Sequence, residues 1–165
     1  MLPAYVYAYK IDMNRFLFLI AFLLTSNICW CQNAYPYQDI KLEKPADYKG
    51  TEPLALSAAS FLLGTPFDEV NADRAAALQF LVKWMTGTKE YNFYMQGKVA
   101  ELGSDQNLLS LYIAAMAKYS LENKASAVNA LTVEQHASKL VLAYCDDAKN
   151  NFKLKKKSRK ILETN

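Results

Sequence analysis

Residues 105–121, with the sequence DQNLLSLYIAAMAKYSL, constrain the fold of this chain more than any other stretch. Apolar side chains occupy almost every face of a helix over these residues, so in a soluble protein other segments must cover that helix on most sides. Only about ten apolar residues run before Lys118 interrupts them, whereas a helix that spans a membrane needs roughly 20. The stretch therefore predicts a central core helix rather than a membrane span.

Length and composition agree with a helical bundle. The 165 residues suit one domain, and five glycines and five prolines are few for a turn-rich sandwich of short strands. We therefore predict an all-α fold, a compact bundle of about four to five helices around the central apolar helix, with an extended N-terminal arm. The arm is expected over residues 32–50 and the helical domain over residues 51–151.

Capping residues and glycines define the ends of the core helices. Four residues are predicted to begin them: Thr51, Asn71, Asp105 and Thr132. The first two helices are expected to end at Gly64 and Gly87, where glycine fits a helix C-terminus. Between the second and central helices, residues 91–95 predict an extended segment packed on the helices, and residues 98–102 a short helical piece.

The first 31 residues match an export signal. A basic residue, Arg15, precedes the nine apolar residues 16–24, and small residues lead to a cleavage site at Cys31/Gln32. An uncleaved N-terminal anchor is the alternative, for which the apolar run is short. The pattern predicts a signal peptide over residues 1–31.

A compact signal begins at Met13, which we take as the true translation start. After cleavage the chain is expected to be periplasmic or secreted, with no integral membrane span.

Cysteine and histidine are too scarce for most site chemistry. Cleavage leaves Cys145 as the last cysteine, so it is either a buried small apolar side chain or half of an intermolecular disulfide. His136 is the sole histidine, so we expect no metal and no cofactor, and a local hydrogen bond for its ring. On one helix the two would lie about 13 Å apart, too far for a nucleophile and its base.

Positive charge is concentrated in residues 152–165, a basic tail or short helix. Six basic and one acidic side chain give this segment a charge of +5, whereas residues 32–151 carry 11 basic and 14 acidic side chains, or −3. The candidate binding residues of the tail are Lys153, Lys155, Lys156, Lys157, Arg159 and Lys160. Such a cluster attracts an acidic envelope protein, anionic lipid or lipopolysaccharide, and an exported protein meets little nucleic acid. A solvated charged face is the simpler alternative.

The N-terminal arm supplies a second candidate surface. Tyr35 and Tyr37 are spaced by two in a segment without helical periodicity, so both could face a partner. Packing of the arm on the chain's own body is the simpler interpretation.

Three segments of the chain are the signal MNRFLFLIAFLL with Gln32 after its cleavage site, the stretch LLSLYIAAMAKYSLENK and the ending LAYCDDAKNNFKLKKKSRK. With these segments the chain as a whole, over most of its mature length, resembles small exported helical proteins of Gram-negative, Bacteroidota-type bacteria, a group with no assigned activity. The resemblance implies export and a helical fold, and it transfers no functional residue.

These observations favour a non-enzymatic interaction module of the cell envelope. An inhibitor or immunity-type protein of an envelope enzyme is an alternative within the same class. An enzyme is the alternative from another class, although adjacent carboxylates such as Asp146 and Asp147 point about 100° apart on a helix and form no acid–base pair.

Overall fold

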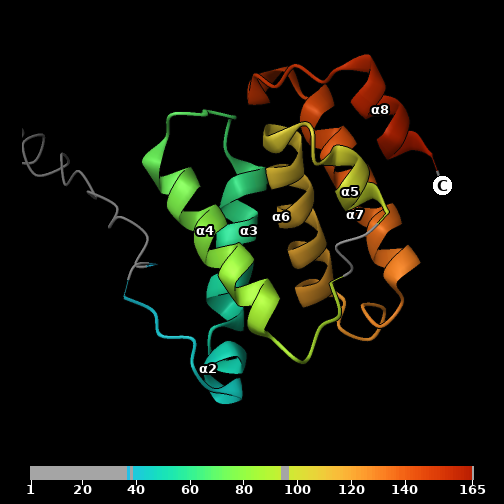
Figure 1. Cartoon of the computed structure of the whole chain (residues 1–165). Helices are drawn as coiled ribbons and strands as arrows, with labels where there is room; N and C mark the ends of the chain where they lie inside the picture. The colour runs from blue at the N-terminus through green and yellow to red at the C-terminus, as the bar shows by residue number, and fades with distance from the viewer. Residues whose placement is uncertain (1–36, 38, 94–96, 165) are drawn as a thin grey trace, which may run out of the picture. The chain divides into compact units, whose positions relative to one another are not determined.

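The computed structural model describes residues 37, 39–93 and 97–164, and every regular element in these residues is helical (Figure 1). In chain order they are α2 (Pro45–Gly50), α3 (Glu52–Gly64), α4 (Ala72–Gly87), α5 (Lys98–Leu102), α6 (Gln106–Glu122), α7 (Ala130–Asp146), the 3-10 turn η1 (Ala148–Asn150) and α8 (Lys156–Glu163). The predicted all-α class is therefore confirmed. The predicted signal peptide and Tyr35 lie outside the described residues.

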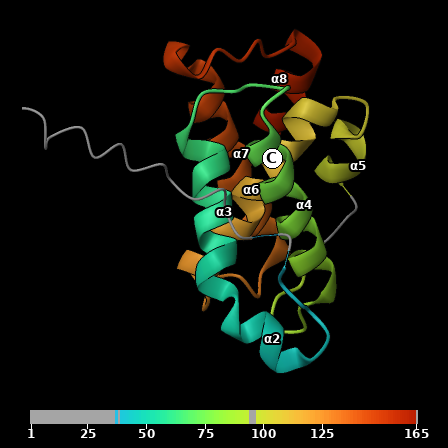
Figure 2. The same ribbon diagram turned by 90° about the vertical axis from the view of Figure 1, so that its left-hand side faces the viewer.

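Helix α6 is the centre of the bundle, as predicted. It packs against α3, α4, α5 and α7, and the two views in Figures 1 and 2 both place it among them. Ten of its 17 residues are buried, among them Leu108 and Leu111 with no exposed surface. Burying one such side chain fully stabilises the fold by about 1.5–3 kcal/mol, so this helix supplies much of the core.

Small side chains line the helices that meet at the centre. The fully buried alanines of α3 and α6 are Ala55, Ala58, Ala59, Ala114, Ala115 and Ala117. Alanine at helical spacing lets neighbouring helix axes approach to the short end of the usual 8–10 Å range.

The structure confirms two predicted helix caps. The side chain of Asn71 accepts a hydrogen bond from the backbone N–H of Arg74 at 3.0 Å, and begins α4. The side chain of Asp105 accepts one from the N–H of Leu108 at 3.5 Å, and begins α6.

The predicted start at Thr132 is wrong, and the predicted role of the Thr51 side chain needs correction. Helix α7 begins before Thr132 because the Asn129 side chain is the cap, accepting from the Thr132 N–H at 3.1 Å. Thr51 precedes α3 as predicted, but its hydroxyl donates to the backbone oxygen of Asp47 at 2.8 Å. That hydroxyl therefore closes α2 rather than capping α3.

The arm departs from the prediction in its last six residues. Residues 39–44 are not helical, whereas residues 45–50 form α2, with Pro45 in the first turn where its missing N–H costs nothing. The indole N–H of Trp84 donates to the backbone oxygen of Tyr48 at 2.9 Å and fixes α2 to α4. A contact between residues 36 positions apart leaves no local signal in the sequence.

The segment after α4 packs on the helices as predicted. The rings of Tyr91 and Phe93 lie 5.6 Å and 6.2 Å from the ring of Trp84. Met95, which was predicted to join them, lies outside the described residues.

Candidate interaction surface

Apolar side chains of the basic tail dock it on the body of the protein. The ring of Phe152 lies edge-on to that of Phe67, with centroids 4.9 Å apart, and Leu162 of α8 is buried. Helix α8 packs against α5 and α7. The structure thus resolves the open choice between a tail and a short helix: residues 156–163 are helical.

The tail lies at the end of the bundle that also carries the loop between α3 and α4. The N–H of Phe67 in that loop donates to the backbone oxygen of Asn150 at 2.8 Å. Both ribbon views show the loop and the segment leading to α8 at the same end (Figures 1 and 2).

Asp105 holds the tail while it caps α6. One of its oxygens accepts a hydrogen bond from the buried Ser158 hydroxyl at 3.2 Å and also pairs with the ammonium of Lys155 at 3.2 Å. Since the Asp105 side chain is mostly buried, this contact is better shielded from solvent than an ordinary surface pair.

Arg159 makes the second attachment. Its guanidinium pairs with the carboxylate of Asp146 at the end of α7 and with that of Glu163 one turn along α8, at 3.7 Å. The hydrogen bond from Arg159 holds the pKa of Asp146 below its usual range, so this pair persists until the medium is strongly acidic. Both partners are substantially exposed, and the pair is worth little stability by itself.

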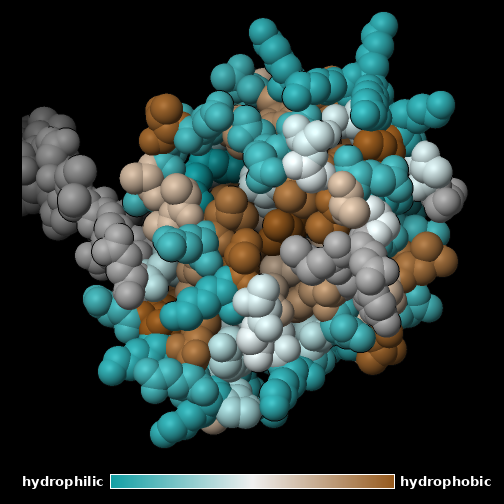
Figure 3. All heavy atoms as spheres, in the orientation of Figure 1, coloured by the Kyte–Doolittle hydropathy of each residue, from teal (hydrophilic) through white to brown (hydrophobic). Residues whose placement is uncertain are grey.

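The remaining cations of the tail form a surface that we call the basic face. It consists of Lys153, Lys156, Lys157 and Lys160. All four side chains are exposed, and none makes an ion pair with any residue that the structure describes. The three lysines on α8 fall within an arc of about 100°, on the side away from Ser158 and Leu162. In Figure 3, long hydrophilic side chains project from this end of the molecule.

Tyr37 of the arm does not join the basic face. Tyr37 is buried, and its ring stacks on Phe80 of α4 with centroids 5.0 Å apart. The candidate surface at Tyr37 is therefore corrected to a packing contact, because the ring gains more from burial against Phe80 than from solvent. Tyr35 lies outside the described residues.

Cys145 lies on α7, half-buried against the core. Burial, with a further contribution from the charge of Asp146, raises the pKa of its thiol to about 12. The thiol is therefore protonated at neutral pH, which disfavours the disulfide exchange that an intermolecular bond would require.

We expect Cys145 of the native protein to react with iodoacetamide at pH 7.5 about a thousandfold more slowly than an exposed cysteine, because so little thiolate is present. Mass spectrometry of alkylation in buffer and in urea measures this difference in rate. Equal rates in the two media would contradict the prediction.

The raised pKa of Cys145 also predicts a loss of stability as the pH rises from about 9 to about 12, since only the unfolded thiol then releases its proton.

One buried cluster superficially resembles a catalytic group. The ammonium of Lys98 donates to the Ser138 hydroxyl at 3.1 Å, and burial raises the pKa of the nearby Tyr112 phenol. Ser138 is only 3% exposed and Tyr112 has no exposed surface, so a substrate has no access to either hydroxyl. These groups satisfy one another between α5, α6 and α7.

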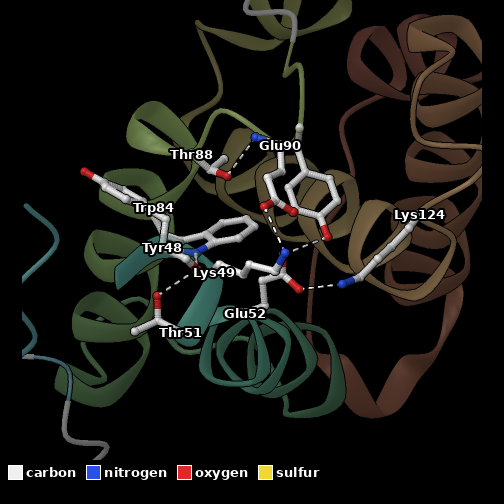
Figure 4. Close-up of polar contacts among 9 residues, drawn as sticks. Tyr48, Lys49, Thr51, Glu52, Trp84, Thr88, Glu90 and Lys124 are labelled. Atoms are coloured by element: carbon white, nitrogen blue, oxygen red, sulfur yellow. Dashed lines mark hydrogen bonds and ion pairs between the residues drawn. The ribbon is translucent and has the colours of Figure 1, made fainter. Parts of the chain in front are cut away.

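A second polar cluster joins three distant segments (Figure 4). The carboxylate of Glu52 accepts from the phenol of Tyr91 at 3.2 Å and pairs with the ammonium of Lys124 at 2.5 Å. Burial raises the pKa of Tyr91, and the bond to Glu52 raises that of Lys124. These two shifts keep the Tyr91 phenol neutral and the Lys124 ammonium charged at neutral pH, as expected of a structural contact rather than an acid–base catalyst.

A hollow of about 320 Å³ lies beside this cluster, between α4 and α6. Apolar side chains make up much of its wall, including Val82, Met85 and Ile113, and the described residues that line it include no carboxylate or imidazole. Figure 3 shows hydrophobic side chains gathered in the middle of the same face. The hollow suits an apolar group.

His136 makes the predicted local hydrogen bond. Its Nδ1 lies 2.8 Å from the backbone oxygen of Thr132, and its ring stacks on Tyr119. Within the part of the chain that the structure describes, no three acidic, histidine or cysteine side chains gather as metal ligands, and no helix is long and apolar enough to cross a membrane.

Sequence reasoning found the exposed lysines but missed the acids that hold the tail. Asp105 was predicted only as a helix cap and Asp146 only as half of an adjacent pair. The net negative charge of residues 32–151 indicates that acidic side chains are available to the tail. The fold determines that Asp105 and Asp146 are the two that contact it.

Comparisons of the chain with protein-family models, with curated proteins and with solved structures gave no match.

Proposed function

We propose that this protein is an exported, non-enzymatic interaction module of the cell envelope, which binds an anionic partner through the basic face. The observation that carries the proposal is a set of four lysines that have no counter-ion among the described residues, on a segment whose other side is docked on the body. Docking fixes the positions of the lysine backbones before any partner arrives, which lowers the ordering cost of binding.

The internal ion pairs of the tail strengthen this argument. If the tail served only to neutralise the acidic body, its cations would all be expected to face carboxylates. Instead Lys155 and Arg159 make those contacts, and the four lysines of the basic face point to solvent. Four uncompensated charges on so short a segment create a local potential that attracts anions.

The proposed compartment rests on the signal-like residues 1–31. It is tested by fractionating cells and measuring the mass of the released chain, which we expect to begin at Gln32. A chain that stays in the cytoplasm at full length would contradict export.

The binding function is tested by co-sedimentation of the mature chain, residues 32–165, with purified envelope fragments that retain their proteins. We expect binding that is lost when Lys153, Lys156, Lys157 and Lys160 are all replaced by glutamine. The matched control replaces with glutamine four exposed lysines elsewhere that make no ion pair within the described part of the chain, Lys41, Lys83, Lys89 and Lys139, and removes the same total charge.

The control should bind like the wild type if location matters and net charge does not. Equal losses in the two variants, or no binding by the wild type, would overturn the proposal.

A further inference from the structure

We infer that the partner of the basic face is the phosphate headgroup layer of an anionic lipid bilayer, a refinement that rests on the proposed function. The shared chemistry is that of an ammonium with a phosphate oxygen. Two alternatives, an acidic protein and free phosphate, are separated by the experiment below.

The identity of the cations favours lipid over protein. All four are lysines, which are depleted at the cores of protein interfaces, where arginine and aromatic side chains provide most of the affinity. The one arginine of the tail, Arg159, is already engaged by Asp146 and Glu163. A lysine ammonium is a strongly hydrated point charge, suited to a diffuse layer of phosphates.

The apolar side chains of the tail pack on the core, so they are not available to a protein partner. Leu162 is buried, and Phe152 and Leu154 are half-buried against the core. The outward positions between Lys153 and Lys160 therefore offer charge without an apolar anchor. Such a surface can rest on headgroups without entering the hydrocarbon.

The arrangement of the lysines favours a surface over a single bound ion. The basic face runs from the extended residue 153 to the second turn of α8, a span of roughly 16 Å by the rise of strand and helix. Lys156 and Lys157 diverge by about 100° on the helix and do not converge on one point. Long side chains that fan outward can each reach a different headgroup.

The side chains of the neighbouring α3–α4 loop determine whether the proposed membrane contact is mainly electrostatic or apolar. Val70 in the α3–α4 loop is 90% exposed at the same end of the bundle, but Asp68 and Glu69 beside it are also exposed. On an anionic bilayer the apolar side chain and the two carboxylates act in opposite directions. Binding should therefore depend on charge and fall steeply with salt.

The test uses the mature chain and protein-free vesicles, either of phosphatidylcholine alone or of phosphatidylcholine and phosphatidylglycerol in equal parts. We expect co-sedimentation with the second and none with the first. Each lysine near an anionic surface contributes about fivefold to the partition constant, so replacing all four should lower it by about 100-fold or more. The four-lysine control described above should stay within a few-fold of the wild type.

Two further measurements complete the design. Inorganic phosphate at matched ionic strength should not release the protein; release would show that free phosphate suffices. Raising the salt should release the wild type. A far-ultraviolet dichroism melt of each variant checks that loss of binding is not loss of fold.

The outcomes distinguish this inference from the proposed function. Binding to envelope fragments through the basic face, without binding to anionic vesicles, would overturn the lipid inference and identify a protein partner. Equal binding to both vesicle types would also overturn it. Loss of envelope binding as well would overturn both proposals.

Discussion

Replacing Arg74 with methionine is expected to lower the free energy of unfolding by about 3 kcal/mol, because a buried network of charge-assisted hydrogen bonds is lost. Arg74 is only 6% exposed, and its guanidinium donates to the backbone oxygen of Leu62 at 3.0 Å and to the Thr65 hydroxyl at 2.7 Å. It also lies over the ring of Phe67. No carboxylate pairs with it among the described residues; the carbonyls at the end of α3 balance its charge instead.

Urea denaturation followed by circular dichroism measures this effect. The matched control is Lys83→Met, which removes an exposed cation from the same helix and should change the stability by less than about 0.5 kcal/mol. Arg74→Met as stable as the control would show that the carbonyls of α3 do not need the guanidinium.

Trp84→Ala is expected to cost about 4 kcal/mol, in the range for removing a buried aromatic side chain. The indole has no exposed surface, contacts the rings of Tyr91 and Phe93, and supplies the hydrogen bond to Tyr48. Its loss should leave a cavity and free α2 from α4.

Trp84→Phe separates the two contributions, because it keeps much of the volume and loses the hydrogen bond. It should cost about 1–2 kcal/mol, with faster hydrogen exchange confined to α2. If the alanine and phenylalanine variants prove equally stable, packing of the indole is not what holds this region. Dichroism is the suitable probe, since Trp84 is the one tryptophan left after the predicted cleavage.

The parts of the fold that could be predicted from sequence are those specified locally. Helix α6 was predicted because nearly all its faces are apolar, and Asn71 and Asp105 because capping depends on residues three positions away. Helix α2 was missed because it is six residues long and its position depends on Trp84. Arg74 was missed as a core residue because an arginine in a first helical turn ordinarily points to solvent.

The same division applies to the candidate site. Exposure of the lysines follows from their amphipathic spacing around Leu162. Which cations of the tail are neutralised depends on two acids outside the tail. Asp105 caps α6 and Asp146 lies at the end of α7, so the spacing of residues within the tail does not identify them. The burial of Tyr37 could not be predicted, since an alternating pattern does not say whether a ring will contact a partner or Phe80.

The buried alanines at the centre of the bundle limit which substitutions the fold tolerates at those positions. A larger side chain at Ala58 or Ala115 would push its helix away from a neighbouring helix, while a smaller one would open space that nothing fills. Any relative with this fold should therefore keep alanine, glycine or serine at these sites while its surface drifts. Small residues in the register of α3 and α6 would reveal kinship even where the lysines of the tail had been replaced.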